Sequence, residues 1–185
     1  MLQRLSPLLE PDLIASGVLA DLPLDVLLAH QIRALVIDVD ATLLPRTCVE
    51  PSATISCWIE SASRQLPLHL FSNNPDRQRI AAIARRFDLP FTAAACKPRR
   101  GALRRVLQQL QLPAAQVAMI GDRLFTDVIA GNRLGLFTVL VRAIDADGRP
   151  AARAPVQRAE LLLARLVGAQ LPSDPASPSD LRPLP

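Results

Sequence analysis

A chain of 185 residues, half of them apolar, can form one domain with a sizeable hydrophobic core. No apolar run reaches 18 residues, and the N-terminal stretch lacks the long apolar block of a secretory signal, so we expect neither a membrane span nor a signal peptide. The net charge of +4 suits a phosphate-bearing partner or an anionic surface, but a generally arginine-rich composition explains it as well. One Trp, no Tyr and five Phe leave few aromatic side chains to stack on bases, which argues against a nucleic-acid partner.

The predicted elements begin, in chain order, with one or two short helices over residues 1–31, which three prolines interrupt. We expect this N-terminal helical segment to pack on the core. The continuous apolar run over 33–40 is typical of a strand that is buried on both faces. Further strands are predicted over 67–74, 89–95, 116–122 and 136–144, and helices over 51–65, 75–88, 98–111, 125–135 and 156–170.

Strands that alternate with helices predict an α/β fold with a central parallel sheet of about five strands and helices on both faces. Such three-layer sheets bind ligands beyond the carboxyl ends of their strands. The tail over 171–185 contains five prolines and three serines, and we expect it to be disordered.

Polar side chains follow the predicted strands at these carboxyl ends. Because successive residues of a strand point to opposite sides, Asp38 and Asp40 can face one pocket while Val39 packs away from it. The sheet would bring the other polar residues to the same edge, namely Thr42, Ser72, Asn73, Lys97, Asp122 and Asp127.

Several carboxylates in one pocket repel one another, and the loss of water increases the penalty, so a cation must compensate. Ligands that are all oxygen atoms suit Mg²⁺, which in turn attracts a phosphate dianion. One carboxylate can then attack phosphorus to form an aspartyl-phosphate, while a second protonates the leaving oxygen and later activates water. Lysine and hydroxyl groups can hold the phosphate oxygens in the transition state.

Each of these signals has an ordinary structural explanation when it is taken alone. A D-x-D pair is common, the residues after Asp122 can form a turn with an N-cap at Thr126, and the polar residues after Phe71 can form a simple turn. A single lysine before a proline, such as Lys97, is usually a solvated surface residue. The functional interpretation depends on their conjunction, because four signals occur in order and each lies at the end of a predicted strand.

The number and spacing of the cysteines indicate the cellular compartment of the protein and not a binding site. Cys48, Cys57 and Cys96 are odd in number, and no Cys-x-x-Cys occurs. We therefore expect neither a zinc site nor a disulfide framework, and a reducing, cytoplasmic compartment fits better.

The order D-x-D-x-T, Ser, Lys and G-D-x-x-x-x-D, over roughly residues 33–143, resembles the haloacid dehalogenase (HAD) superfamily of phosphatases. The resemblance implies a Rossmann-like HAD domain of subclass IIIA over 32–170. It also implies that Asp38 is the nucleophile and that Asp40 is the general acid/base.

The same resemblance implies the ligands of the metal and of the phosphate. The Mg²⁺ ion would be held by Asp38, the backbone carbonyl of Asp40, and Asp122, with Asp127 in support. The phosphate would be bound by Ser72 and Lys97, together with Thr42 and Asn73.

Narrower similarities, in FSNN, CKPRRGAL and GDRLFTDVIAGNRLG, point to the YqeG-like branch of this superfamily. That branch includes phosphatidylglycerophosphate phosphatases of bacteria, mitochondria and plastids. Ala41 departs from it, because Asn is usual at this position. The catalytic pattern does not require that side chain, so the departure bears on local hydrogen bonding rather than on activity.

Neither gap in which this superfamily inserts a cap domain is long enough for one here. About ten residues separate Asp40 from the next predicted helix, and one helix and one strand fill the gap from Ser72 to Lys97. An open site fits a phosphate presented by something large, such as a lipid headgroup at a membrane surface, a protein or a nucleic-acid end.

Two parts of the chain are candidates for membrane contact. The leucine-rich segment over 1–31 can dock on an interface or pack over the sheet as core, and we favour the core. The arginines of the helices over 75–88 and 98–111 can meet anionic lipid or face solvent.

The leading hypothesis is a Mg²⁺-dependent hydrolysis of phosphatidylglycerophosphate to phosphatidylglycerol, by a protein that is cytoplasmic or peripheral on the inner face of a membrane. An alternative keeps the chemistry and changes the substrate to a phosphoprotein, a nucleotide or a sugar phosphate. In a receiver-like phospho-acceptor the acids should precede the acceptor strand, whereas here Asp40 follows Asp38. An inactive scaffold is disfavoured because all the expected acids are present.

Overall fold

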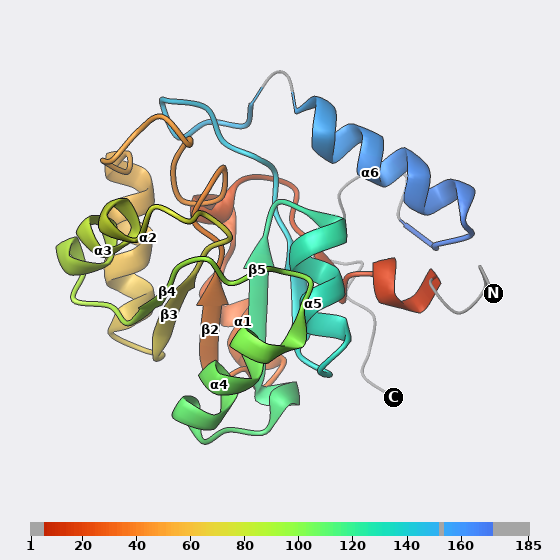
Figure 1. Cartoon of the computed structure of the whole chain (residues 1–185), viewed down its shortest axis with the longest axis horizontal. Coiled ribbons are helices and arrows are strands. Elements are labelled where there is room, and N and C mark those ends of the chain that lie inside the picture. Colours follow the sequence, from red (N-terminus) through yellow and green to blue (C-terminus); the bar gives the residue numbers. More distant parts are fainter. Residues whose placement is uncertain (1–5, 152–153, 172–185) are drawn as a thin grey trace.

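The computed structural model describes residues 6–151 and 154–171, and the structural statements that follow refer to these ranges. They contain one sheet of six parallel strands, in the order β1-β6-β5-β2-β3-β4 (Figure 1). The tail predicted to be disordered over 171–185 lies outside the described residues except for Leu171. The strands are β1 (Leu13–Ile14), β2 (Ala34–Ile37), β3 (Leu68–Phe71), β4 (Phe91–Thr92), β5 (Val117–Gly121) and β6 (Phe137–Leu140).

Helices cover both faces of the sheet, which confirms the predicted three-layer α/β fold. In β2, Leu35 and Ile37 belong to one core, whereas Ala34 and Val36 belong to the other. The first core is covered by α1 (Leu24–Ala29), α2 (Ala53–Ser63) and α3 (Arg77–Arg86), and the second by α4 (Arg100–Leu110) and α5 (Ile129–Asn132).

The last helix, α6 (Pro155–Leu166), lies apart from these two layers, at the upper right of Figure 1. It packs through the buried residues Glu160 and Ala164 against a π-helical turn, η5 (Leu124–Val128). Three short 3-10 helices complete the described elements, namely η2 (Ser6–Leu9), η3 (Leu19–Asp21) and η4 (Ala114–Gln116).

The sheet has six strands rather than about five, because part of the N-terminal segment is extended and not helical as predicted. Asp12 Oδ2 accepts hydrogen bonds from the backbone N–H and the hydroxyl of Thr138 in β6, at 2.7 and 2.9 Å. This anchor aligns Leu13 and Ile14 with the edge of β6. The sequence did not indicate this strand, because a two-residue strand has no periodic pattern.

Several of the described leucines in the N-terminal segment pack over the sheet rather than outward. Leu19, Leu22 and Leu27 are buried in the core that α2 and α3 also cover. These leucines therefore belong to the hydrophobic core, and they are not available for contact with a membrane. Within residues 6–151 and 154–171, no helix is both long and apolar enough to cross a membrane.

The carboxyl ends of the strands stay open because the connections after them are short. An irregular loop joins Asp40 to α2, and α3 and β4 occupy the chain between Ser72 and Lys97. No further domain covers this edge of the sheet in the part of the chain that the structure describes.

Candidate active site

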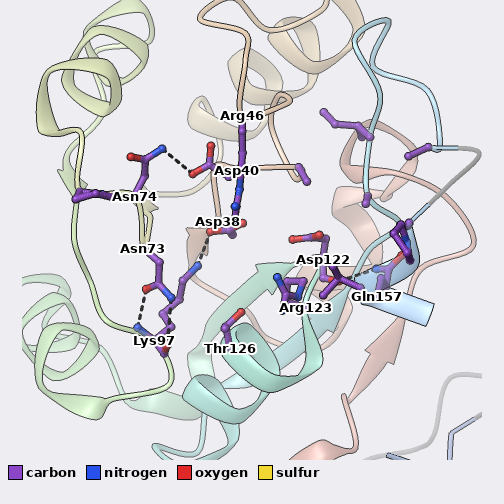
Figure 2. A pocket seen from close by; sticks show the side chains of 18 residues that line it. Asp38, Asp40, Arg46, Asn73, Asn74, Lys97, Asp122, Arg123, Thr126 and Gln157 are labelled. Atoms are coloured by element: carbon purple, nitrogen blue, oxygen red, sulfur yellow. Dashed lines mark hydrogen bonds and ion pairs between the residues drawn. The ribbon is translucent and has the colours of Figure 1, made fainter. Parts of the chain in front are cut away.

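A pocket of about 600 Å³ opens at the carboxyl ends of the strands. Figure 2 shows its labelled side chains converging from several elements, with Asp40 and Asn74 on one side and Asp122 and Arg123 on the other. The pocket is also lined by the loop after Asp40 and by the first residues of α6. Of the polar residues at the predicted strand ends, those that line the pocket are Asp38, Asp40, Asn73, Lys97 and Asp122.

Three carboxylates form the centre of this site. Asp38 follows β2, Asp122 follows β5, and Asp127 lies in the turn η5. All three are buried, and each offers an oxygen within 4.8 Å of the others. Gly121 is required for this approach, because a Cβ atom at that position would overlap the Asp127 carboxylate.

Lys97 lies between two of these carboxylates, although it was equally open to interpretation as a surface residue. Its Nζ donates hydrogen bonds to Asp38 Oδ1 and to the carbonyl of Phe71, and it lies 2.6 Å from Asp127 Oδ1. The lysine is only 6% exposed. Three carboxylates around one ammonium group leave two negative charges in a buried cluster.

The buried cluster changes the proton affinity of its members. Burial raises the pKa of Asp38 despite the opposing effect of Lys97, and the charge of Asp127 raises it further. Burial, together with Asp127 and Asp38, raises the pKa of Asp122 to about 8. Burial alone would lower the pKa of Lys97, but Asp127 and Asp38 raise it above its usual value, so the lysine stays charged.

The donor set fits a hard divalent cation. Asp122 Oδ1 is buried and accepts no hydrogen bond, which is costly for a carboxylate unless a cation satisfies it. The ligands are all oxygen atoms, and the two remaining negative charges match the charge of Mg²⁺. Asp38, Asp122 and Asp127 can therefore hold the predicted metal.

Asp40 lies apart from this group and has its own partners. Its Oδ1 accepts a hydrogen bond from Arg79 Nη1 at 2.8 Å, and its Oδ2 accepts from Ser72 Oγ and Asn74 Nδ2 at 3.2 and 3.3 Å. The Asp40 side chain therefore does not join the three clustered carboxylates. The resemblance assigns its backbone carbonyl to the metal, and that assignment stays a prediction.

The other predicted phosphate ligands contact the acids or Lys97. The Thr42 hydroxyl donates to Asp38 Oδ2 at 3.4 Å, and the Ser72 hydroxyl donates to Asp40. The Asn73 amide bonds to both backbone groups of Lys97, at 2.6 and 3.1 Å. These side chains hold the acids and the lysine in place, and their direct contact with phosphate stays a prediction.

Sequence reasoning missed several residues that support the site from α3 and α6. Arg79 was only one of eight arginines on two predicted helices, so nothing local distinguished it. The buried Glu160 accepts hydrogen bonds from Arg123 Nε at 2.8 Å and from the backbone N–H of Leu124 at 2.9 Å. Gln157 Nε2 donates to the carbonyl of Asp122 at 2.7 Å. Helix α6 thereby fixes the loop that carries Asp122.

Two curated proteins are similar to this chain in sequence. The probable phosphatase YqeG of Bacillus subtilis is 29% identical over 113 residues, covering 60% of this chain and 65% of that protein. Phosphatidylglycerophosphate phosphatase 1, chloroplastic, of Chlamydomonas reinhardtii is 32% identical over 130 residues, covering 64% of this chain and 47% of that protein. The chain thus matches between about half and two thirds of the length of these relatives.

Solved structures share the fold at low sequence identity. A hypothetical protein from Xanthomonas campestris matches with a TM-score of 0.53 at 18% identity, over 79% of this chain and 90% of that chain. An uncharacterized protein from Listeria monocytogenes serotype 4b matches with a TM-score of 0.51 at 19% identity, over 73% of this chain and 99% of that chain. These likenesses support the fold and not a substrate.

A family comparison agrees with the motifs and with the sheet. Residues 94–167, which include Lys97, Asp122 and Asp127, match the family described as HAD-hydrolase-like. The acids that precede this range follow the central strand β2 of a three-layer parallel fold. The chain is therefore similar to the haloacid dehalogenase superfamily over residues 94–167, and to the probable phosphatase YqeG.

Proposed function

We propose that this protein is a Mg²⁺-dependent phosphomonoesterase in which Asp38 is the nucleophile and Asp40 the general acid/base. The observation that carries the proposal is the cluster of Asp38, Asp122 and Asp127, in which Lys97 pairs with Asp38 and Asp127. Asp38, Asp40 and Asp122 line the pocket beside it. Such a cluster supplies a nucleophile, a proton carrier and groups that offset charge within one open site.

The reaction proceeds in two steps. A carboxylate oxygen of Asp38 bonds to phosphorus and the bond to the leaving oxygen breaks, while Asp40 gives that oxygen a proton. Asp40 then takes a proton from a water molecule whose oxygen attacks phosphorus, which releases phosphate and restores the Asp38 carboxylate. Lys97 Nζ, next to Asp38, stabilises the negative phosphoryl oxygens. When bound, Mg²⁺ would offset the charge of the carboxylates and of the phosphate.

The substrate that we propose is phosphatidylglycerophosphate, with hydrolysis to phosphatidylglycerol. The similarity to the chloroplastic phosphatase of Chlamydomonas supports this substrate. The open pocket supports it as well, because a headgroup held at a bilayer can enter a site that no further domain covers among the described residues. A soluble phosphoprotein, nucleotide or sugar phosphate can enter the same pocket, and these classes are the alternatives to be tested.

The exposed apolar residues of helix α6 also support the proposal that the substrate lies in a membrane. Leu162, Leu163 and Leu166 are 60%, 50% and 81% exposed, and Val156, on the same helix, lines the pocket. The exposed Arg46 lines the pocket as well. An apolar face beside a pocket that is lined by an exposed arginine fits an anionic bilayer, so the protein would act from the inner face of a membrane as a peripheral protein.

The test of the activity and substrate measures phosphate release by the purified protein with and without Mg²⁺. The substrates are phosphatidylglycerophosphate in anionic vesicles, a phosphopeptide, a nucleoside monophosphate and a sugar phosphate. We expect Mg²⁺-dependent turnover with the highest kcat/KM for the lipid. Equal or higher values for a soluble ester would reject the lipid substrate and retain the phosphatase, whereas no turnover of any ester would reject both.

A second experiment tests the membrane face of α6 with a matched control. Leu163→Ser and Leu166→Ser, combined, should reduce sedimentation with anionic vesicles and hydrolysis of the vesicle substrate, but not hydrolysis of a soluble phosphate ester. Leu28→Ser is the control, because Leu28 is 42% exposed on α1, just before the amino end of β2 and away from the pocket. Equal vesicle binding by wild type, the double variant and Leu28→Ser would contradict membrane binding by these leucines. A smaller molecular mass of the double variant in solution would show that the leucines serve self-association instead.

A further inference from the structure

Arg79 connects helix α3, the loop after Asp40, and the Asp40 carboxylate. Its backbone N–H is part of the N-cap of α3, where it donates to Asp76 Oδ1 at 3.0 Å. Its guanidinium donates to Asp40 Oδ1 at 2.8 Å, to the carbonyl of Pro45 at 3.1 Å, and to the carbonyl of Cys48 at 2.9 and 3.3 Å. The side chain is 10% exposed. Four hydrogen bonds therefore fix this guanidinium in one orientation.

This arrangement makes the two oxygens of Asp40 unequal. A guanidinium has only donors and stays protonated, so the oxygen that faces Arg79 can act only as an acceptor. The other oxygen, Oδ2, has longer contacts with Ser72 Oγ and Asn74 Nδ2, at 3.2 and 3.3 Å. A serine hydroxyl can rotate to accept instead of donate. A proton on the Asp40 carboxyl group therefore belongs on Oδ2.

We propose that Arg79 is a positioning residue for proton transfer: it reserves Asp40 Oδ1 as an acceptor, so that Oδ2 carries the proton to the leaving oxygen. The inference rests on the proposed function, because it assigns a role within that reaction. Arg79 acts through Asp40 and does not contact the reacting phosphate in this role. Its bonds to the carbonyls of Pro45 and Cys48 supply the rigidity that the positioning requires.

The simpler alternative is that Arg79 only fastens the loop of residues 45–48 to α3. Loss of Arg79 lowers activity in either case, so activity alone does not separate the two roles. The dependence of the rate on the leaving group separates them. An alkyl phosphate needs a proton on its leaving oxygen, whereas dinitrophenyl phosphate expels an anion that is already stable, and a general acid accelerates only the former strongly.

The experiment compares wild type, Arg79→Gln, Arg79→Lys and Asp40→Asn on these two soluble substrates with Mg²⁺. The measured quantity is the ratio of the two kcat/KM values, which reports the step that forms the aspartyl-phosphate and does not depend on the fraction of folded protein. We expect Arg79→Gln to lose about 100-fold on the alkyl ester and less than about 10-fold on the dinitrophenyl ester, the pattern of Asp40→Asn. Arg79→Lys should fall between wild type and Arg79→Gln.

The matched control is Arg86→Gln. Arg86 lies on the same helix and pairs with Glu50 of the same connection to α2, but the two atoms are 3.4 Å apart and both side chains are exposed. Its substrate ratio should equal that of wild type. Equal losses on both esters in Arg79→Gln would reject the positioning role and leave only the loop anchor. A wild-type protein that hydrolyses neither these esters nor phosphatidylglycerophosphate in vesicles would instead reject the proposed function.

Discussion

Lys97 Nζ donates a hydrogen bond to Asp38 Oδ1, although 59 residues separate the two in the chain. The same nitrogen pairs with Asp127 at 2.6 Å, so a single ammonium group serves two carboxylates at once. The nucleophile that we propose is therefore held by a lysine that is itself fully enclosed. Two substitutions and a change of pH test what this arrangement implies.

Asp38→Asn should abolish turnover and leave the fold intact. The amide cannot attack phosphorus, and the loss of a covalent nucleophile lowers kcat by roughly a thousandfold or more. Lys97 keeps its pair with Asp127, and one of three mutually repelling carboxylates disappears. Phosphate release and thermal unfolding should be measured together. A variant that turns over at the wild-type rate would show that another residue is the nucleophile.

Lys97→Met should weaken both the fold and phosphate binding. The substitution keeps most of the side-chain volume but leaves Asp38 and Asp127 buried without their cation. Removing one member of a buried ion pair costs about 3 kcal/mol, which urea denaturation without metal can resolve. The KM for the phosphate ester should rise as well. Unchanged stability together with an unchanged KM would contradict the position of Lys97 in the cluster.

Mg²⁺ should stabilise the protein more at about pH 8 than at about pH 5.5. In the metal-free fold the pKa of Asp122 rises from 3.8 to about 8, so the folded protein binds more protons than the unfolded chain between these values. This contribution makes stability fall as the pH rises through that range. At the higher pH the carboxylates are already ionised, so metal binding displaces fewer protons. At a concentration one hundred times its Kd, the metal adds about 2.7 kcal/mol to the free energy of unfolding.

The check is the melting temperature with Mg²⁺ minus that with a chelator, at matched ionic strength and at each pH. Asp122→Asn is the control, because the variant lacks the group whose pKa is raised most clearly and should show a smaller and flatter difference. A wild-type difference that is independent of pH, or larger in acid, would contradict binding at these carboxylates.

Ala41→Asn should stabilise the fold. Ala41 has a φ of +66°, in the left-handed region, and its backbone is fixed by bonds to Leu44 and Ile144. This region costs an alanine roughly 1–2 kcal/mol, and Asn tolerates it better, so we expect a gain of about 0.5–1 kcal/mol in urea denaturation. Ala41→Val should be destabilised, because a β-branched residue suits this conformation poorly. Similar stabilities for the three proteins would show that the backbone at this position adapts to the side chain.

The backbone at Ala41 also explains why the YqeG-like pattern prefers Asn at this position. The usual Asn suits a left-handed residue, which is a backbone requirement and not a catalytic one. The sequence indicated that activity does not need this side chain, and the backbone angle supplies the physical reason for the preference.

The sequence by itself determined the layer order and the acids at the strand ends. Apolar runs for the buried strands alternate with helical patterns, and parallel strands must bring their carboxyl ends to one edge. Asp38, Asp122 and Asp127 were therefore expected at one edge of the sheet, and the pairing of β2 with β5 brings them together there. The short connections follow from the same local signals, whereas the strand order comes from the structure.

Only the tertiary structure decided how the supporting residues act. Arg79 and Arg86 look alike in the sequence of α3, yet one holds Asp40 and the other pairs with Glu50 at the surface. Strand β1 likewise exists because Asp12 bonds to Thr138, 126 residues away. Such roles depend on which face of a helix meets which loop, and on bonds between distant segments. Local periodicity carries no information about either, because it reports burial and not the identity of the partner.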